Sequence, residues 1–143
     1  MKNHIGCGYL QNVTTANNWR KVVSQLAKNI KAANLDFESI AFCGMSGALV
    51  APTVAGRLGK TILMVRKDND GSHSGCKLEG NPNTKNFIIV DDLLFTGSTI
   101  NRIIETIRAN DFTKDAKCVG IFLYNSHRNH NFNDIPVKSF LIY

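Results

Sequence analysis

The sequence lacks the features that mark secreted and membrane proteins. Its four cysteines are scattered with no Cys-x-x-Cys pair, and Cys43 and Cys118 lie in apolar stretches, as small core residues do. The pattern favours a reduced, cytosolic protein. The N-terminus has no apolar signal-peptide core, and no segment reaches the length needed to span a membrane. We therefore expect a cytoplasmic protein without a membrane partner.

Acidic residues are also scarce, because 11 Asp and Glu stand against 17 Lys and Arg, giving a formal net charge of +6. Such a balance is compatible with a nucleic-acid surface or with a site for a polyanionic small molecule. The basic residues are dispersed along the chain rather than gathered into one run with aromatic residues. We therefore favour a strongly anionic small molecule and expect no nucleic-acid partner.

Internal repeats and low-complexity segments are absent as well, and 143 residues suit a single domain with a substantial core. Apolar periodicity predicts helices starting at Asn17 or Asn18 and ending near Asn34, over 48–58 and over 97–110. Apolar runs predict strands at 39–43, 61–65, 86–91, 117–124 and 137–143. Residues 1–16 are expected to be irregular or to hold a short strand, and 67–85 to form a polar loop. Alternating strands and helices predict an α/β fold, a parallel sheet with helices on both faces.

Two adjacent carboxylates, Asp91 and Asp92, end the apolar run that begins at Phe87. A short loop, 95–99, then opens into the apolar pattern of a helix. Backbone N–H groups and the helix dipole make such a terminus favourable for a phosphate, and sugar hydroxyls can donate hydrogen bonds to the carboxylates. Because ligands bind at the carboxyl ends of parallel strands, the segment predicts a sugar-phosphate site. The alternative is an acidic strand end followed by a capped helix.

Two further segments follow strands that we expect to lie in the same sheet. The turn 44–47 comes directly after one strand, and its glycines allow backbone amides to approach a phosphate closely. Arg66 and Lys67 end another strand and open the long loop that contains His73. Cations there can neutralise charge that develops on a leaving group. The alternatives are ordinary turn chemistry, a solvated strand end and a loop histidine without a catalytic role.

The run from Val90 to Thr99 resembles the phosphoribosyl pyrophosphate (PRPP) signature of the type I phosphoribosyltransferases. The resemblance implies that Asp91 and Asp92 contact the ribose hydroxyls as catalytic residues. It implies a 5-phosphate loop made of Phe95, Thr96, Gly97, Ser98 and Thr99. It implies a pyrophosphate site made of Gly44, Met45, Ser46, Gly47, Arg66 and Lys67. The implied cofactor is Mg²⁺, held mainly by the substrate near the two acids rather than by the protein.

Two branches of the family share features with the rest of the chain. The Arg66-Lys67 pair and His73 are similar to the orotate branch, in which a mobile loop meets the departing pyrophosphate. This implies a catalytic His73 and a lid over 68–85. The tail resembles the purine branch and implies a hood made of 1–16 and 125–143 around a core of 17–124, all within one domain. The residues implied to contact the base are Tyr124, Asn125 and Phe140.

The implied activity is transfer of the 5-phosphoribosyl group from PRPP to orotate or a purine, by a homodimer, with release of pyrophosphate. Phe95 departs from the family pattern, in which threonine or aspartate stands, and phenylalanine cannot move a proton of the base. A non-catalytic PRPP- or nucleotide-binding regulatory module of the same fold is the alternative. A receiver-type domain fits less well, because its acid pair normally ends the first strand. His127 and His130 lack a Cys or acid at ligand spacing, so we expect a solvated loop there.

Overall fold

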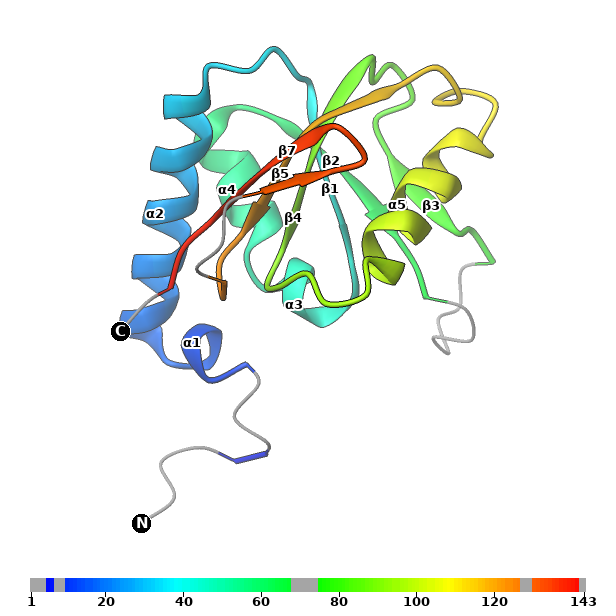
Figure 1. The fold of residues 1–143 in the computed structure, drawn as a ribbon. Coiled ribbons are helices and arrows are strands. Elements are labelled where there is room, and N and C mark those ends of the chain that lie inside the picture. Colours follow the sequence, from blue (N-terminus) through cyan, green and yellow to red (C-terminus); the bar gives the residue numbers. More distant parts are fainter. Residues whose placement is uncertain (1–4, 7–9, 68–74, 127–129, 142–143) are drawn as a thin grey trace.

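A computed structural model of the chain describes residues 5–6, 10–67, 75–126 and 130–141 (Figure 1). Seven strands form one sheet in the order β3-β2-β1-β4-β5-β7-β6. The strands are β1 (Ser39–Cys43), β2 (Thr61–Val65), β3 (Leu78–Gly80), β4 (Asn86–Asp91), β5 (Lys117–Leu123), β6 (His130–Phe132) and β7 (Ile135–Ser139). The central strands pair in parallel, which confirms the predicted parallel sheet. The two edge strands, β3 and β6, are antiparallel to their neighbours.

Helices cover both faces of this sheet. They are α1 (Gln11–Thr14), α2 (Ala16–Ala33), α3 (Gly44–Ala48), α4 (Ala51–Leu58) and α5 (Ser98–Arg108). Figure 1 shows α2 and α4 on one side of the sheet and α5 on the other. Side chains alternate along each strand accordingly, since Ile40 and Phe42 of β1 join the core under α2 and α4, whereas Ala41 and Cys43 join the core under α5.

The helices form because their apolar residues recur at the helical period. In α5 the buried residues are Ile100, Ile103, Ile104 and Ile107, one stripe that faces the sheet. α2 buries a similar stripe and ends at Asn34, which takes the left-handed conformation of a C-cap. Both helices were predicted. The prediction for residues 1–16 was wrong, because α1 and the first residue of α2 lie in this segment, which was expected to be irregular or to hold a short strand.

The polar segment 67–85 contains a strand that its composition conceals. β3 pairs with the edge of β2, Arg66 N–H donates to the Lys77 carbonyl, and the Arg66 guanidinium lies 3.3 Å from a Glu79 carboxylate oxygen. Backbone pairing of this kind needs no apolar pattern, so the expectation of a structureless loop is wrong here. A lid over all of 68–85 is wrong for the same reason. His73 lies in 68–74, outside the described residues.

The tail also contains more regular structure than its sequence indicates. β6 and β7 form a hairpin whose turn residues, Asn133 and Asp134, both have positive φ, 47° and 66°. Asn and Asp tolerate this conformation better than other non-glycine residues, and two-residue hairpins require it. The predicted strand 137–143 therefore begins earlier, at Ile135, and the polar segment 125–133 is partly a strand.

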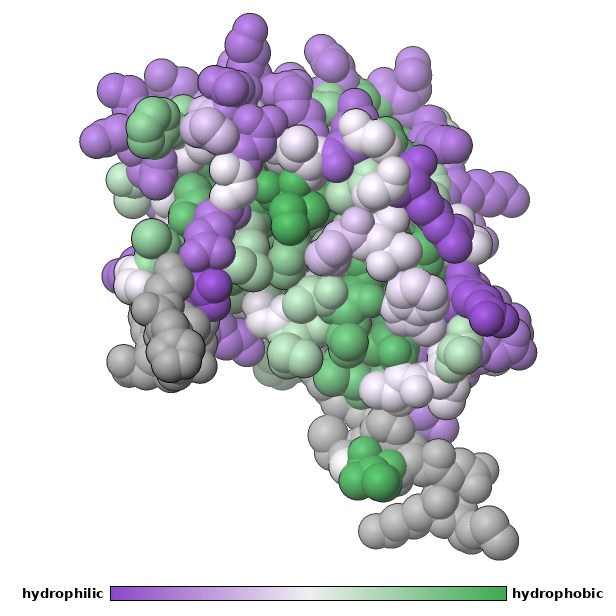
Figure 2. All heavy atoms as spheres, turned by 180° about the vertical axis from the view of Figure 1, so that it is seen from behind, coloured by the Kyte–Doolittle hydropathy of each residue, from purple (hydrophilic) through white to green (hydrophobic). Residues whose placement is uncertain are grey.

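The face opposite to the view of Figure 1 combines apolar and hydrophilic surface. Figure 2 shows apolar residues in the middle of this face and hydrophilic residues along its top and sides. Among the described residues, no helix is both long enough and apolar enough to cross a bilayer.

Candidate active site

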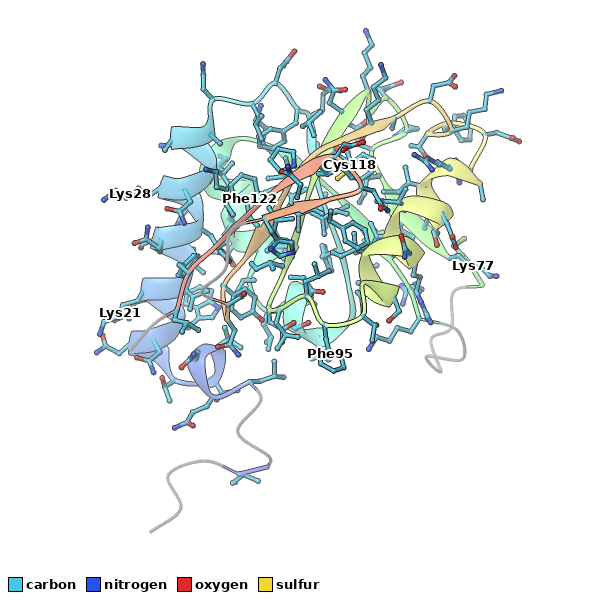
Figure 3. The ribbon with its side chains drawn as sticks, in the orientation of Figure 1. Lys21, Lys28, Lys77, Phe95, Cys118 and Phe122 are labelled. Atoms are coloured by element: carbon cyan, nitrogen blue, oxygen red, sulfur yellow. The ribbon has the colours of Figure 1, made fainter. Side chains whose placement is uncertain are left out.

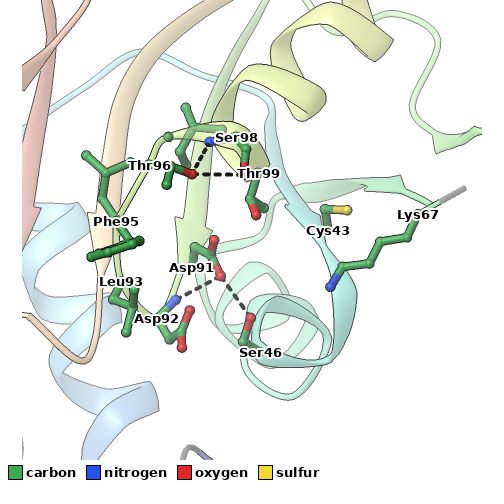
Figure 4. A pocket seen from close by; sticks show the side chains of 13 residues that line it. Cys43, Ser46, Lys67, Asp91, Asp92, Leu93, Phe95, Thr96, Ser98 and Thr99 are labelled. Atoms are coloured by element: carbon green, nitrogen blue, oxygen red, sulfur yellow. Dashed lines mark hydrogen bonds between the residues drawn. The ribbon is translucent and has the colours of Figure 1, made fainter.

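A cavity of about 210 Å³ lies at the carboxyl ends of β1 and β4 (Figure 4). In the sheet, β2 lies on one side of β1, whereas β5 lies on the opposite side of β4, so the strand order reverses between β1 and β4. Ligands bind at such switch points in open α/β sheets. The cavity is lined by Cys43, Ser46, Lys67, Asp91, Asp92, Leu93, Leu94, Phe95, Thr96, Gly97, Ser98, Thr99 and Ile100.

The acid pair forms the floor of this cavity. Asp91 is 4% exposed and Asp92 is 2% exposed. One oxygen of Asp91, Oδ1, accepts hydrogen bonds from the Ser46 hydroxyl and from the Asp92 backbone N–H, each at 2.9 Å. Oδ2 of Asp92 is buried, and no described residue donates a hydrogen bond to it. A buried carboxylate oxygen without a partner is costly, so the site suits a donor or a cation that the described residues do not supply.

The electrostatics of the pair lead to the same conclusion. Burial, and secondarily the charge of Asp92, raise the pKa of the Asp91 carboxyl from 3.8 to about 7. The hydrogen bonds from Ser46 and from the Asp92 N–H partly oppose this rise. The free site therefore resists carrying two negative charges at neutral pH. A bound cation, or a ligand on which positive charge develops, stabilises the doubly ionised pair.

Beside the acids, the loop 95–99 leads into the N-terminus of α5. Gly97 is the N-cap residue and has a φ of 81°, and no described side chain makes a capping hydrogen bond there. The Phe132 ring of β6 lies against Gly97, so close that an added Cβ would be 2.6 Å from its Cε2 atom. The Thr96 hydroxyl accepts from the Ser98 N–H at 3.3 Å. Backbone N–H groups at this terminus and the helix dipole favour an anion.

A cation lies on the other side of the acids. The Lys67 side chain extends from the end of β2 across Gly44, where an added Cβ would be 3.0 Å from Lys67 Cε and 3.3 Å from Nζ. Figure 4 shows its ammonium group directed into the cavity. Gly44, which has a φ of 79°, is the first residue of α3, so the predicted turn 44–47 is itself the start of a helix. This corner of the cavity suits a second anionic group.

Several residues predicted to bind pyrophosphate do not line this cavity. The Arg66 guanidinium pairs with Glu79 and lines a neighbouring groove together with Lys77 and Arg102. Met45 is exposed, and Gly47 packs against Phe42. Of the set, Ser46 and Lys67 reach the cavity, and Gly44 lies beneath Lys67.

The residues expected to contact a base are similarly divided. Tyr124 is 2% exposed, and its hydroxyl donates to the Ser46 carbonyl at 2.6 Å, so its ring belongs to the core. Phe140 packs against the core under α2 and lines a separate groove beside that helix. Asn125 remains near the acids, since its N–H donates to the Asp92 carbonyl at 2.7 Å. Of the three, only Asn125 is held beside the acid pair.

The structure also adds residues that the sequence did not single out. The cavity is lined by four further residues, Cys43, Leu93, Leu94 and Ile100. The Phe132 ring packs against Gly97 of the loop 95–99. Cys43 and Ile100 carry only the signal of core residues. For Phe132, the signal was the turn pair Asn133-Asp134, which would have indicated a hairpin that returns β6 to the sheet.

Comparisons with known proteins agree with this geometry. The family described as phosphoribosyl transferase domain matches residues 11–140. A transcriptional regulator, GfcR, of Methanocaldococcus jannaschii is 27% identical over 102 residues, which is 66% of this chain and 48% of that protein. An orotate phosphoribosyltransferase of Rhizobium etli is 28% identical over 103 residues, 71% of this chain and 44% of that enzyme. The chain thus spans about half the length of these relatives.

The fold is shared with solved structures. Orotate phosphoribosyltransferase of Francisella tularensis superposes with a TM-score of 0.70 at 13% identity, over 90% of this chain and 68% of that chain. The strand order and the helices on both faces are therefore those of the type I phosphoribosyltransferase fold, as predicted. Because the family match covers residues 11–140, the chain belongs to the phosphoribosyl transferase domain family.

Proposed function

We propose that the cavity binds PRPP and that the protein transfers the 5-phosphoribosyl group to a nucleobase, releasing pyrophosphate. The observation that carries this proposal is the unpartnered Oδ2 of Asp92 beside Asp91, in a cavity with one anion-binding feature on each side. PRPP has the matching pattern: a sugar with two neighbouring hydroxyls lies between a phosphate and a pyrophosphate.

Each group of the donor has a counterpart in this arrangement. The ribose 2- and 3-hydroxyls donate to the carboxylates of Asp91 and Asp92. The 5-phosphate accepts hydrogen bonds from the backbone N–H groups at the start of α5, within 95–99. The pyrophosphate lies toward Gly44 and the Lys67 ammonium. The net charge of +6 favours approach of so anionic a substrate.

The residues present also fit Mg²⁺. Mg²⁺ prefers oxygen ligands and is commonly bound through one or two carboxylates together with substrate oxygens and waters. Asp91 and Asp92 supply two such carboxylates, one with an unpartnered oxygen, and no group of three or more metal-ligating side chains occurs among the described residues. Bound with the donor, Mg²⁺ would neutralise charge on the pyrophosphate. Asp91 and Asp92 would orient the ribose, and Asp91 would release its proton to water when the cation binds.

The transfer itself forms one bond and breaks one. The lone pair of a base nitrogen forms a bond to the anomeric carbon, and the bond from that carbon to the pyrophosphate oxygen breaks with both electrons remaining on oxygen. The base nitrogen loses its proton to water. The carboxylates stabilise the positive charge that develops on the ribose, and Lys67 stabilises the charge on the departing group. His73, within 68–74, is proposed to act on the same group.

The base is proposed to be orotate or a purine, and the Rhizobium etli relative, an orotate phosphoribosyltransferase, supports orotate. A second candidate function is a non-catalytic module that binds PRPP or a nucleotide and regulates another process. The likeness to the GfcR transcriptional regulator favours it. So does Phe95, which brings no acid to the cavity. A homodimer, predicted from the family, is proposed for either function.

One assay separates the two functions. Purified protein with PRPP and Mg²⁺ is given orotate, adenine, guanine or hypoxanthine, and pyrophosphate release is measured with and without the base. Replacing both acids, Asp91→Asn with Asp92→Asn, is expected to lower base-dependent release by at least ~100-fold, since these groups act on the transition state. Asp111→Asn with Asp115→Asn removes the same charge from exposed positions and is expected to leave release unchanged.

Calorimetry with PRPP completes the test. Binding without release of pyrophosphate on any base selects the regulatory module. If PRPP does not bind, or if the double variant at 91 and 92 releases pyrophosphate as fast as the wild type, the proposed site is wrong.

A further inference from the structure

Phe95 is the large apolar residue of the loop 95–99, and the fold leaves it exposed. Its side chain is 91% exposed, whereas Gly97 beside it and the acids before it are buried. Single exposed apolar residues are common on protein surfaces and need no explanation. Phe95, however, lines the cavity and projects at its edge (Figures 3 and 4). Its exposed ring contributes little to the core, so its place at the cavity is better explained by contact with a ligand than by packing.

The position of the ring relative to Lys67 is informative. In Figure 4, Phe95 and Lys67 lie on opposite sides of Asp91. In a displacement at the anomeric carbon, the attacking nitrogen and the departing oxygen lie on opposite faces of the sugar. If the pyrophosphate is held at the Lys67 side, the base enters from the side of Phe95. The charged and the aromatic group thus face the two chemically different partners of the ribose.

The chemistry of a nucleobase matches an aromatic side chain. A base has a planar apolar face that stacks on aromatic rings and a polar edge that is satisfied by water or backbone groups. Among the described residues that line the cavity, Phe95 supplies the only aromatic ring. Tyr124 and Phe140, the other aromatic candidates, are held in the core and beside α2.

We infer that Phe95 is the platform on which the base stacks, and that it selects a planar heteroaromatic acceptor over a non-aromatic one. This inference rests on the proposed function. The backbone N–H of Asn125 donates to the Asp92 carbonyl, which holds that residue beside the acid pair, where its amide is available to the polar edge of the base. Stacking makes no demand on the identity of the base, so the platform admits orotate and purines alike.

The experiment compares ligands that differ only in the base. Affinities of ribose 5-phosphate and of two nucleotides, AMP and orotidine 5′-monophosphate, are measured by calorimetry on the wild type and on Phe95→Leu. Leucine keeps an apolar side chain and removes the ring. We expect the tighter-binding nucleotide to lose about 5- to 20-fold in affinity, as for a base stacked on an aromatic side chain, with ribose 5-phosphate unchanged.

Two further variants make the result specific. Phe95→Tyr keeps a stacking ring and is expected to bind the nucleotide within about 2-fold of the wild type. Phe112→Leu removes another exposed phenylalanine, one that does not line this cavity, and is expected to change neither affinity.

The possible outcomes separate the inference from the proposal beneath it. If ribose 5-phosphate and PRPP fail to bind the wild type, the proposed function is wrong and the inference falls with it. If both bind, but Phe95→Leu leaves nucleotide affinity unchanged or lowers the affinity of ribose 5-phosphate equally, the platform is overturned and the PRPP site stands.

Discussion

The two sides of the cavity differ in how firmly the fold holds their side chains. On the sugar-phosphate side, made of Ser46, Asp91, Asp92 and the backbone of the loop 95–99, the acids are buried. They are hydrogen-bonded to two other segments, α3 and the residues that follow β5. On the base side, made of the Phe95 ring and Asn125, one side chain is exposed and the other is anchored by its backbone. The proposed recognition of the sugar phosphate therefore relies on groups built into the sheet, whereas the proposed recognition of the base relies on side chains that can change without disturbing the sheet.

A prediction with a large effect concerns the cost of that burial. The Asp91 pKa is about 7 in the folded chain against an ordinary value of 3.8. The contribution of Asp91 to the free energy of unfolding therefore falls as pH rises from about 4 to 7, because the folded chain keeps a proton that the unfolded chain releases. Asp91→Asn cannot ionise and still accepts from Ser46. At pH 8 we expect it to be more stable than the wild type by roughly 2–4 kcal/mol, as one pKa unit corresponds to about 1.4 kcal/mol.

Urea unfolding at pH 4, 6 and 8 measures this difference, which should vanish near pH 4. Asp115→Asn, at an exposed position, is the matched control and should alter stability by less than ~0.5 kcal/mol. The same variant at 91 should bind PRPP more weakly, so that stability and binding change in opposite directions. An Asp91→Asn protein with no gain in stability at pH 8 would show that burial of the acid pair is not costly.

The sugar-phosphate side was also the part that could be predicted from the sequence. The strand that ends in Asp91 and Asp92 and the isoleucine stripe of α5 are continuous in the chain, so local pattern was sufficient. The placement of Lys67 followed only from adding the rule that parallel strands end at one edge of the sheet.

The remainder depended on contacts between distant segments. Arg66 is diverted from the cavity by Glu79, which lies on β3, a strand held by backbone pairing with no apolar signature. Tyr124 shares a face with Phe122, two residues earlier, and both enter the core under α2. That alternation was visible in the sequence. The Ser46 carbonyl that accepts from the Tyr124 hydroxyl lies 78 residues away and could not be found by local pattern.

A second prediction tests whether the backbone of the loop 95–99 is as constrained at Gly97 as its conformation and its contact with Phe132 suggest. Gly97→Ala places a side chain at a φ of 81° and against the Phe132 ring. The left-handed conformation alone costs about 1–2 kcal/mol for a residue with a Cβ. We expect stability to fall by that amount and PRPP affinity to fall about 10-fold, since the N–H groups at the start of α5 shift.

Gly56→Ala is the matched control, because an added Cβ there meets nothing within 4 Å and the residue lies inside α4. It should gain about 0.5–1 kcal/mol and leave PRPP affinity unchanged. Thermal unfolding and calorimetry of the two variants provide the comparison. Equal PRPP affinities for Gly97→Ala and the wild type would mean that the phosphate is bound elsewhere.

The prediction with the smallest effect tests whether Tyr124 supports the sugar-phosphate side or the base side of the cavity. Its hydroxyl donates to the Ser46 carbonyl at 2.6 Å, and the Ser46 hydroxyl donates to Asp91 at 2.9 Å, so the bond fixes α3 against the acids. Tyr124→Phe removes this bond and should cost about 1 kcal/mol of stability. If Tyr124 supports the sugar-phosphate side, the affinities of ribose 5-phosphate and of a nucleotide fall together. We expect a loss of about 2- to 5-fold, which corresponds to roughly 0.4–1 kcal/mol, because Ser46 is held less firmly against Asp91. If it contacts the base, only the nucleotide loses affinity.

Thr113→Val is the control for a purely structural loss. The Thr113 hydroxyl also donates to a backbone carbonyl, that of Ile107 at 2.8 Å, and Thr113 is buried and does not line the cavity. Both variants should lower stability by a similar ~1 kcal/mol, as each removes one buried hydroxyl-to-carbonyl bond. Only Tyr124→Phe should weaken ribose 5-phosphate. If the two variants affect ligand affinity equally, the hydrogen bond to Ser46 stabilises the fold without positioning the acids. The sugar-phosphate side would then depend on the ends of β4 and β5 alone.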